Sequence, residues 1–140
     1  MAIPNDIDAR CFYRSAKERL EDAQVLLGAT PKRTTGTVYL AGYSVECLLK
    51  ALILSSEPPA RHAETLESFR GSKAHSFDWL REQYQLRSGQ VFSREIRNHF
   101  RTLNSWGTSL RYVPATFSDS QANRFLKASE AFLVWAESRL

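Results

Sequence analysis

One stretch of the chain decides its fold: Tyr39-Leu40-Ala41-Gly42-Tyr43-Ser44-Val45-Glu46-Cys47-Leu48-Leu49-Lys50-Ala51-Leu52-Ile53-Leu54. It is apolar on almost every face of a helix, and such a helix must be buried on most sides. Yet it contains Glu46 and Lys50, and charged residues are almost never fully buried unless they are paired. Because Glu46 precedes Lys50 by four residues, one interpretation is an ion pair through which the central helix reaches solvent at one point. The alternative is that Glu46 orients a polar group in a cleft, since functional sites often hold partly buried carboxylates.

Helix start and stop signals divide the rest of the chain into further helices. The expected ranges are 8–28, 36–55, a short helical turn within 60–69, then 76–86, 91–103, and a last helix after Ser118. Asp8 is the expected cap of the first helix, and Ser118 with Gln121 forms a capping box at the last. No segment alternates with a period of two, so strands have little support. The sequence therefore predicts an all-α fold, an antiparallel up-and-down bundle of four to five helices.

Composition indicates one intracellular domain. At 140 residues, the chain can bury about 68% of its unfolded surface, which is enough for one core. We expect a single domain over residues 1–140, with a flexible N-terminus over residues 1–7. The two cysteines, Cys11 and Cys47, have no metal-binding or redox spacing, which favours a reduced cytoplasmic protein. The first ten residues contain Asp6, Asp8 and Arg10, charges that the apolar h-region of a signal peptide lacks. Glu46 and Lys50 interrupt the longest apolar run, so no membrane span is expected.

The positive charge is concentrated in one segment. Between Arg70 and Arg111 there are eight bases and three acids, a balance of +5, whereas the remaining eleven bases and twelve acids sum to −1. Arg94, Arg97 and Arg101 share one helix face, and Arg side chains match phosphate oxygens in a forked geometry. This face could therefore bind phosphates, or it could simply be solvated. The nearby aromatic residues Phe92 and Phe100 fit the core stripe with Ile96 and Leu103.

The histidines do not form a recognisable metal site. His62 is expected to be exposed, and His75 is expected to pack under the loop that precedes a helix cap at Ser76. The three histidines are scattered, with no cluster of acidic or cysteine ligands around them, so neither a metal nor a cofactor is expected. Glycine-rich phosphate loops, nucleophile elbows and paired catalytic carboxylates are not visible either, which argues against the enzyme classes built on them.

Three segments of the chain resemble a known family. Ala41 to Ile53, with the pattern Ala-x-Tyr-x-Val-Glu-x-x-Leu-Lys-Ala-Leu-Ile, is similar to the second helix of HEPN domains, small helical modules of prokaryotic nucleotidyltransferase systems and of defence and toxin proteins. His75 to Leu80 resembles the family's His-Asp-Leu-x-x-Leu helix start. Leu110 to Pro114 resembles its Arg-Tyr-Pro segment. With the Ala-rich last helix, the resemblance covers residues 8–140 in the right order.

The resemblance raises the question of ribonuclease activity. HEPN ribonucleases carry an Arg-x4-6-His motif, in which Arg stabilises the phosphorane and His shuttles protons. Arg94 and His99 match it, but about one match is expected by chance in a chain of this composition, and Arg70 with His75 is a second. On one straight helix Arg94 and His99 lie about 140° apart, with His99 on the edge of the apolar stripe, where a core histidine is expected. In the Arg-Tyr-Pro branch the ribonuclease His is usually missing.

Three functional hypotheses follow. The first is a non-catalytic, nucleotide- or RNA-binding and partner-docking module. The resemblance implies a separately encoded minimal nucleotidyltransferase as its partner, in a toxin-antitoxin or defence system. Its ligand-binding residues would be Arg111, Tyr112, Glu46 and Lys50 in a cleft, with Arg97 and Arg101 contacting single-stranded RNA. The second is a metal-independent ribonuclease toxin that uses Arg94 and His99 across a dimer interface. The third is a purely structural dimer. A two-fold homodimer is expected in each, because the central helix is apolar on more faces than its neighbours were expected to cover.

Overall fold

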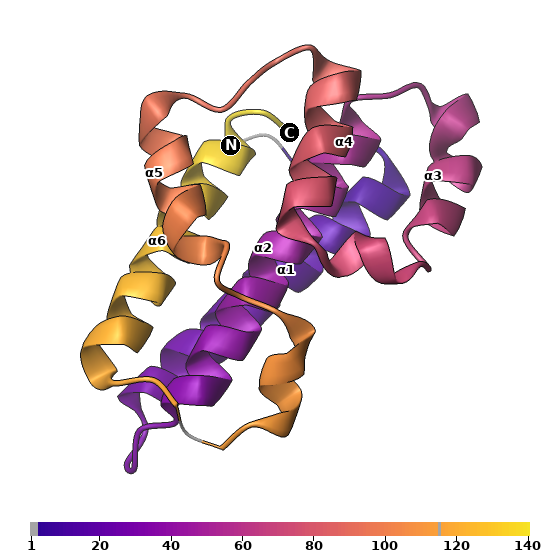
Figure 1. Cartoon of the computed structure of the whole chain (residues 1–140). Helices are drawn as coiled ribbons and strands as arrows, with labels where there is room; N and C mark the ends of the chain where they lie inside the picture. The colour runs from indigo at the N-terminus through magenta and orange to yellow at the C-terminus, as the bar shows by residue number, and fades with distance from the viewer. Residues whose placement is uncertain (1–2, 115) are drawn as a thin grey trace.

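Every regular element of the part that the computed structural model describes, residues 3–114 and 116–140, is helical (Figure 1). It contains α1 (Ile7–Gly28), α2 (Thr34–Ser55), α3 (His62–Ser68), α4 (Phe77–Ser88), α5 (Arg94–Leu103) and α6 (Asp119–Glu137). Three short 3₁₀ segments lie between them: η1 (Pro59–Arg61), η2 (Ser72–His75) and η3 (Thr108–Tyr112). The predicted all-α class is confirmed. The described residues form six α-helices, whereas four to five were predicted, because the short α3 is a separate helix.

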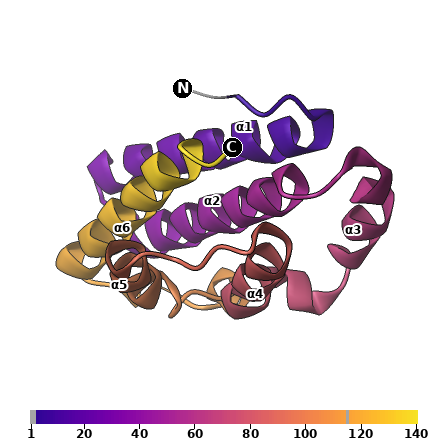
Figure 2. The ribbon, with the colours of Figure 1, turned by 90° about the horizontal axis from the view of Figure 1, so that it is seen from above.

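The helices are arranged around α2, which runs through the centre of the molecule (Figures 1 and 2). Its most extensive contacts are with α1, followed by α6 and α4, while α5 packs against α6. The end of α6 returns to the start of α1, where the Tyr13 hydroxyl donates a hydrogen bond to Glu137. The burial of α2 by three neighbours explains why its sequence lacks a polar face.

The close packing of α1 on α2 depends on small side chains. α1 buries Ala9, Ala16 and Ala23 in a stripe that also includes Tyr13 and Leu20. The buried Ser44 hydroxyl of α2 donates to the Ala16 carbonyl oxygen at 2.7 Å. This hydrogen bond satisfies a polar group that would be costly to bury alone.

The first helix begins earlier than predicted. Asp6, not Asp8, is its N-cap, and the Asp6 carboxylate accepts a hydrogen bond from the Ala9 backbone N–H at 2.8 Å. The Arg10 side chain also donates to the carbonyl oxygens of Pro4 and Asn5. Positions 4–6 of the expected flexible N-terminus are therefore held by hydrogen bonds, and Met1 and Ala2 lie outside the described residues.

The central helix is covered within one chain. Of its 22 residues, 16 are buried. By length and apolar composition α2 meets the requirement for a membrane-spanning helix, but 83% of its most apolar window lies inside the fold. Core packing therefore explains the apolar character of α2. It also removes the argument that α2 needs a second subunit to cover it, since α1, α4 and α6 cover it already.

An unusually close contact joins α2 to the segment before η3. A Cβ atom on Gly42 would lie 2.0 Å from Cδ1 of Trp106, so only glycine permits this packing. The indole Nε1–H of Trp106 donates to the Tyr39 carbonyl oxygen at 3.0 Å. The same ring stacks on Phe77 at the start of α4, with centroids 5.0 Å apart. Trp106 therefore joins α2, α4 and the η3 segment.

His62 is buried, so the expectation that it is exposed was wrong. Its Nδ1 faces the Asp6 carboxylate at 3.0 Å, and its Nε2 faces the carbonyl oxygens of Leu54 at 2.8 Å and Glu57 at 3.2 Å. All three partners are acceptors, and an imidazole ring can donate from both nitrogens only when it is protonated, so this arrangement favours the imidazolium form. Asp8 completes a group of three potential cation ligands, but the hydrogen bonds of His62 already explain its position. The ring joins the start of α1 to the end of α2.

Other sequence expectations are confirmed. Ser118 and Gln121 form the predicted reciprocal capping box at α6. Phe92 and Phe100 are core residues, each at most 2% exposed. Their positions are set by a cluster of aromatic rings in which Phe92 contacts Phe100, Phe132 and Trp135.

Candidate functional site

The basic face of α5 points away from the core. Ile96, Phe100 and Leu103 are the buried residues of this helix. At 100° per residue, Arg94, Arg97 and Arg101 fall on the opposite side, and all three are exposed. α5 begins at Arg94, later than predicted, because the Ser93 hydroxyl accepts a hydrogen bond from the Ile96 backbone N–H and so caps the helix there. The three arginines therefore extend along nearly the full length of this short helix, from its first residue to its last turn.

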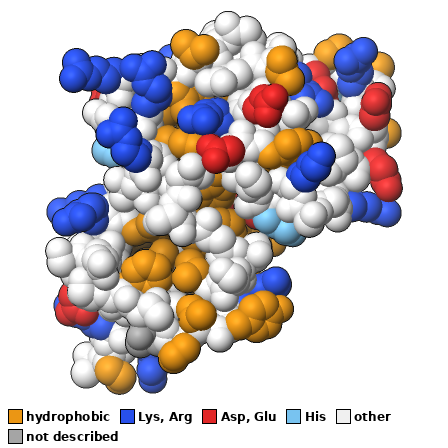
Figure 3. All heavy atoms as spheres, in the orientation of Figure 1, with side chains coloured by type: hydrophobic (Ala, Val, Ile, Leu, Met, Phe, Trp, Pro, Cys, Tyr) orange, Lys and Arg blue, Asp and Glu red, His pale blue; other side chains and the backbone are white. Residues whose placement is uncertain are grey.

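The arginines of this face have no internal partners. Within residues 3–114 and 116–140, Arg94, Arg97 and Arg101 form neither an ion pair nor a side-chain hydrogen bond, whereas Arg81 pairs with Asp78 and Arg87 with Glu57. Figure 3 shows Lys and Arg side chains gathered over the α5 region. Unpaired guanidinium groups in such a cluster are free to bind an external anion.

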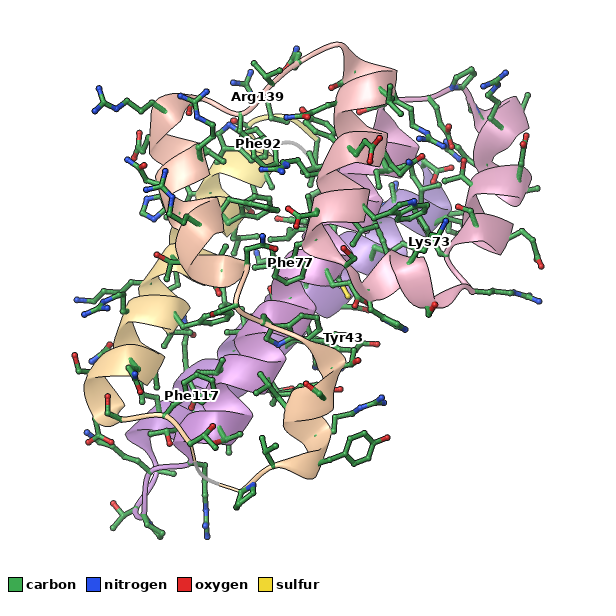
Figure 4. The ribbon with its side chains drawn as sticks, in the orientation of Figure 1. Tyr43, Lys73, Phe77, Phe92, Phe117 and Arg139 are labelled. Atoms are coloured by element: carbon green, nitrogen blue, oxygen red, sulfur yellow. The ribbon has the colours of Figure 1, made fainter. Side chains whose placement is uncertain are left out.

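A cleft of about 260 Å³ lies between the end of α5 and the start of α6. Its lining is Arg101, Thr102, Ser105, Phe117, Gln121, Arg124 and Phe125. The described lining contains two cations, two aromatic rings and no carboxylate. Phe117 precedes α6 and is labelled in Figure 4. This arrangement can hold an anion beside a flat apolar group.

Sequence analysis identified Arg101 but missed Arg124 and Phe117. Arg124 lies outside the basic segment, and Gln121 had been assigned only a capping role. The i, i+3 spacing of Gln121 and Arg124 places them on one face of α6. That this face lies beside the end of α5 depends on how the two helices pack together, and no local sequence pattern predicts this packing.

A second polar group joins α2 to η2. The Lys50 ammonium donates to Oε2 of Glu46 at 3.0 Å, and Nδ1–H of His75 donates to Oε1 of the same carboxylate at 2.9 Å. The side chains of Glu46 and Lys50 are 3% and 7% exposed, whereas that of His75 is 47% exposed. The pair therefore does not bring α2 to the surface. The predicted ion pair of Glu46 and Lys50 is present but internal. Glu46 also orients His75, which is partly exposed rather than packed under its loop.

Lys50 is stabilised by aromatic rings as well as by Glu46. Its ammonium lies 5.8 Å from the ring centroid of Phe12 and 5.4 Å from that of Phe69. These contacts offset part of the cost of burying the charge. Glu46 and Lys50 thus belong to an internal network and are not accessible to a ligand directly.

Arg111 and Tyr112 lie at the surface of η3. Tyr112 is 79% exposed. The Arg111 guanidinium lies 5.3 Å from the ring centroid of Tyr112, and its Nε–H donates to the Thr108 carbonyl oxygen. No described contact joins this exposed pair to the buried Glu46 and Lys50, so the structure does not place the four side chains in one group.

Arg94 and His99 also occupy different environments. Arg94 is exposed at the first residue of α5, whereas His99 is half-buried on the flank of the helix. His99 is not among the core residues, so the expectation that it is a core histidine was wrong. Its ring has no hydrogen-bonding partner within the described residues.

Comparison with protein families matches the HEPN domain over residues 9–139. The match covers nearly the whole chain, and the protein therefore belongs to the HEPN domain family. No curated protein and no solved structure matches the chain. The family resemblance found in the second helix, the start of α4 and η3 is thus confirmed.

Proposed function

We propose that this HEPN domain is a non-catalytic module that binds RNA or a nucleotide through the phosphate groups. The observation that supports this most is the set of unpaired arginines on α5: Arg94, Arg97 and Arg101. If this face served only to keep the protein soluble, a mixture of acidic and basic side chains would do equally well. Instead, α5 carries three arginines and only one acid, Glu95. Arginine is the residue best suited to phosphate recognition.

A salt titration tests this proposal. Binding of a fluorescent single-stranded RNA oligonucleotide is measured by anisotropy between low and physiological salt. If three or four phosphates are contacted, log K falls against log[salt] with a slope of about −2 to −3. Changing all three α5 arginines to Gln should abolish most of the binding. No binding at low salt, or binding that is indifferent to salt, would remove the proposal.

A charge-matched control separates site binding from general attraction. Arg14, Arg33 and Arg61 are exposed, and none of them belongs to α5 or lines the cleft. Changing these three to Gln removes the same net charge as the α5 variant. The control should retain most of the RNA affinity. Equal losses in both triple variants would mean that only the net charge of +4 matters.

We also propose a two-fold dimer and a protein partner. Support for a protein-binding surface comes from exposed apolar side chains around η3, where Tyr112 is 79%, Val113 40% and Tyr43 36% exposed. Figure 3 shows apolar side chains over the lower part of this face. Such patches often mark interfaces. Sedimentation that gives a monomer at tens of micromolar, for both wild type and Tyr112→Ser, would exclude the dimer.

The partner class that the family suggests is a minimal nucleotidyltransferase, in a toxin-antitoxin or defence pair. The Leu110 to Pro114 segment, which carries the resemblance to the Arg-Tyr-Pro branch, is exposed from Arg111 onward. Coexpression with a nucleotidyltransferase encoded beside this gene should give a complex that survives size-exclusion chromatography. Separate elution of the two proteins at micromolar concentration would exclude this pairing.

The ribonuclease remains a second candidate because His99 is half-buried and lacks a partner. For a nuclease, His99→Ala and Arg94→Ala should each reduce RNA cleavage about 10²- to 10⁴-fold and leave the melting temperature nearly unchanged. If the wild-type protein binds RNA without cleaving it, the result supports the non-catalytic binding module. If it cleaves RNA and the cleavage needs both side chains, the ribonuclease replaces the binding module as the function.

A further inference from the structure

We infer that the cleft between α5 and α6 holds one unstacked nucleotide of a single-stranded RNA, with its phosphate between Arg101 and Arg124 and its base against Phe117. This inference rests on the proposed RNA-binding function and adds a specific site to it. It differs from the α5 face in using two residues, Phe117 and Arg124, that lie outside the basic segment.

The phosphate position follows from the two arginines of the cleft. Arg101 comes from the last turn of α5 and Arg124 from the second turn of α6, and both line the same cleft. Neither forms an ion pair within the described residues. The nearest acid in sequence, Asp119, is paired with Lys32 at 3.2 Å. Two unpaired cations facing one small cleft repel each other until an anion binds between them.

The base position follows from Phe117. This ring is half-buried and packs against the core, yet it lines the cleft and has no aromatic partner within the described residues. Sequence-tolerant binding of single strands commonly uses an aromatic ring that stacks on a base. The buried Phe125 also lines the cleft. A base in the cleft would therefore contact apolar surface while its phosphate faces the arginines.

The polar groups of the cleft suit a hydrogen-bonding ligand. The Gln121 side-chain oxygen accepts from the Ser118 backbone N–H at 2.9 Å. Its oxygen is therefore occupied and its amide N–H groups are free to donate. The Ser105 hydroxyl donates to the Thr102 carbonyl oxygen, which leaves its lone pairs to accept a hydrogen bond, for example from a ribose 2′-hydroxyl.

The size of the cleft favours one unit of a longer strand. At about 260 Å³ the cleft lies just below the usual range of ligand sites, about 300–1,000 Å³, and it is too small for a duplex. From Arg101 the basic face continues to Arg97 and Arg94 over a helical rise of about 10 Å. Phosphates adjacent to the bound nucleotide would meet these residues. A free mononucleotide would leave them unused.

The test uses two cleft variants that have different signatures. Phe117→Leu should weaken binding of a single-stranded RNA decamer at least about fivefold and leave the salt slope unchanged, because only stacking is lost. Arg124→Gln should weaken binding and reduce the magnitude of the salt slope by about 0.7, because one phosphate contact is lost. Arg124 is exposed, so its variant should fold normally even if Phe117→Leu is less stable.

Each variant has a matched control. Lys127 lies one turn after Arg124 on α6, is exposed and does not line the cleft. Phe12 is a half-buried phenylalanine on α1 that packs edge-on against Phe69. Lys127→Gln and Phe12→Leu should therefore bind RNA with affinity and salt slope close to those of wild type. Cleft variants that behave like these controls would overturn the inference.

The failure of this inference differs from the failure of the proposed function. If wild type binds RNA and the α5 triple variant does not, while Phe117→Leu and Arg124→Gln bind normally, then the cleft is not the site but the function stands. If wild type binds no RNA, the function itself fails. Uridine monophosphate that competes as strongly as the decamer, mole for mole, would show a free-nucleotide site and overturn the single-strand inference. A duplex that binds as tightly as the single strand would also overturn it.

Discussion

Gly42→Ala is expected to destabilise the protein even though alanine is the better helix former. In an exposed helix, this change stabilises by about 1 kcal/mol. Here the added Cβ would lie 2.0 Å from Cδ1 and 2.1 Å from Nε1 of Trp106, so the indole must move by more than an ångström. The displacement breaks the Nε1–H hydrogen bond to Tyr39, worth about 1 kcal/mol. It also breaks the stacks on Phe77 and Tyr39, worth about 1 kcal/mol each.

The sum is a net loss of about 2 kcal/mol. Thermal unfolding followed by circular dichroism should therefore show a melting temperature lower by about 6 to 10 °C for a chain of this size. Gly36→Ala in the same helix is the control. Its Cβ would meet Cδ1 of Leu26 at 3.1 Å, the end of a flexible side chain, and Cβ of Arg33 at an ordinary contact distance of 3.9 Å. This variant should be neutral or slightly more stable.

A double-variant cycle isolates the contact. When Trp106 is already alanine, Gly42→Ala has no ring to displace and should be neutral or stabilising. The coupling energy between the two positions should then be about 3 kcal/mol, the whole of the lost Trp106 contacts. If Gly42→Ala raises the melting temperature as Gly36→Ala does, the close packing of Trp106 on α2 is wrong.

Three further predictions concern buried polar groups. Burial alone lowers the pKa of His62, but hydrogen bonds from its ring to backbone carbonyls and the neighbouring Asp6 charge outweigh it and raise the pKa. The stability that His62 contributes is therefore full below its unfolded pKa of about 6.5 and is lost as the pH rises through the higher folded value. Urea unfolding should show wild type losing more stability than His62→Gln between pH 6 and 8.5, and parallel curves would contradict this. Lys50→Met should lower the free energy of unfolding by about 3 to 5 kcal/mol, because it leaves the Glu46 carboxylate buried without its cation. Adding Glu46→Gln should recover most of this loss. A double variant as unstable as Lys50→Met alone would contradict the stabilisation of Glu46 by Lys50. Burial raises the pKa of Cys47 to about 12, so a thiol reagent at pH 8 should modify only the exposed Cys11 in the native protein and both thiols in denaturant.

The features that could be predicted from sequence are those encoded within one or two helical turns. The apolar run of α2 requires a central buried helix, and the Ser118 and Gln121 capping box marks the start of α6. The period of Phe92, Ile96, Phe100 and Leu103 indicates a core stripe, and all four residues are buried. Each signal involves neighbouring residues, whose relative positions the helix geometry determines.

The features that sequence analysis missed depend on contacts between distant residues. His62 contacts Asp6, which lies 56 positions away in the chain, and His75 contacts Glu46, which lies 29 positions away. No local sequence pattern indicates contacts between residues so far apart, and for this reason His62, which was expected at the surface, proved to be buried. The predicted ion pair of Glu46 and Lys50 is present, but it does not reach solvent as one interpretation held, and it forms an internal network with a second histidine, His75.

The sequence by itself determined the helical class, the central position of α2, the family and the concentration of arginine on α5. Only the tertiary structure decided which of these charges are unpaired and that α5 meets α6. It thereby brought Arg101, Phe117 and Arg124 to one cleft. The physical reason is that periodicity and capping specify which face of a helix is buried, whereas the neighbour that covers that face is selected by the packing of the whole core.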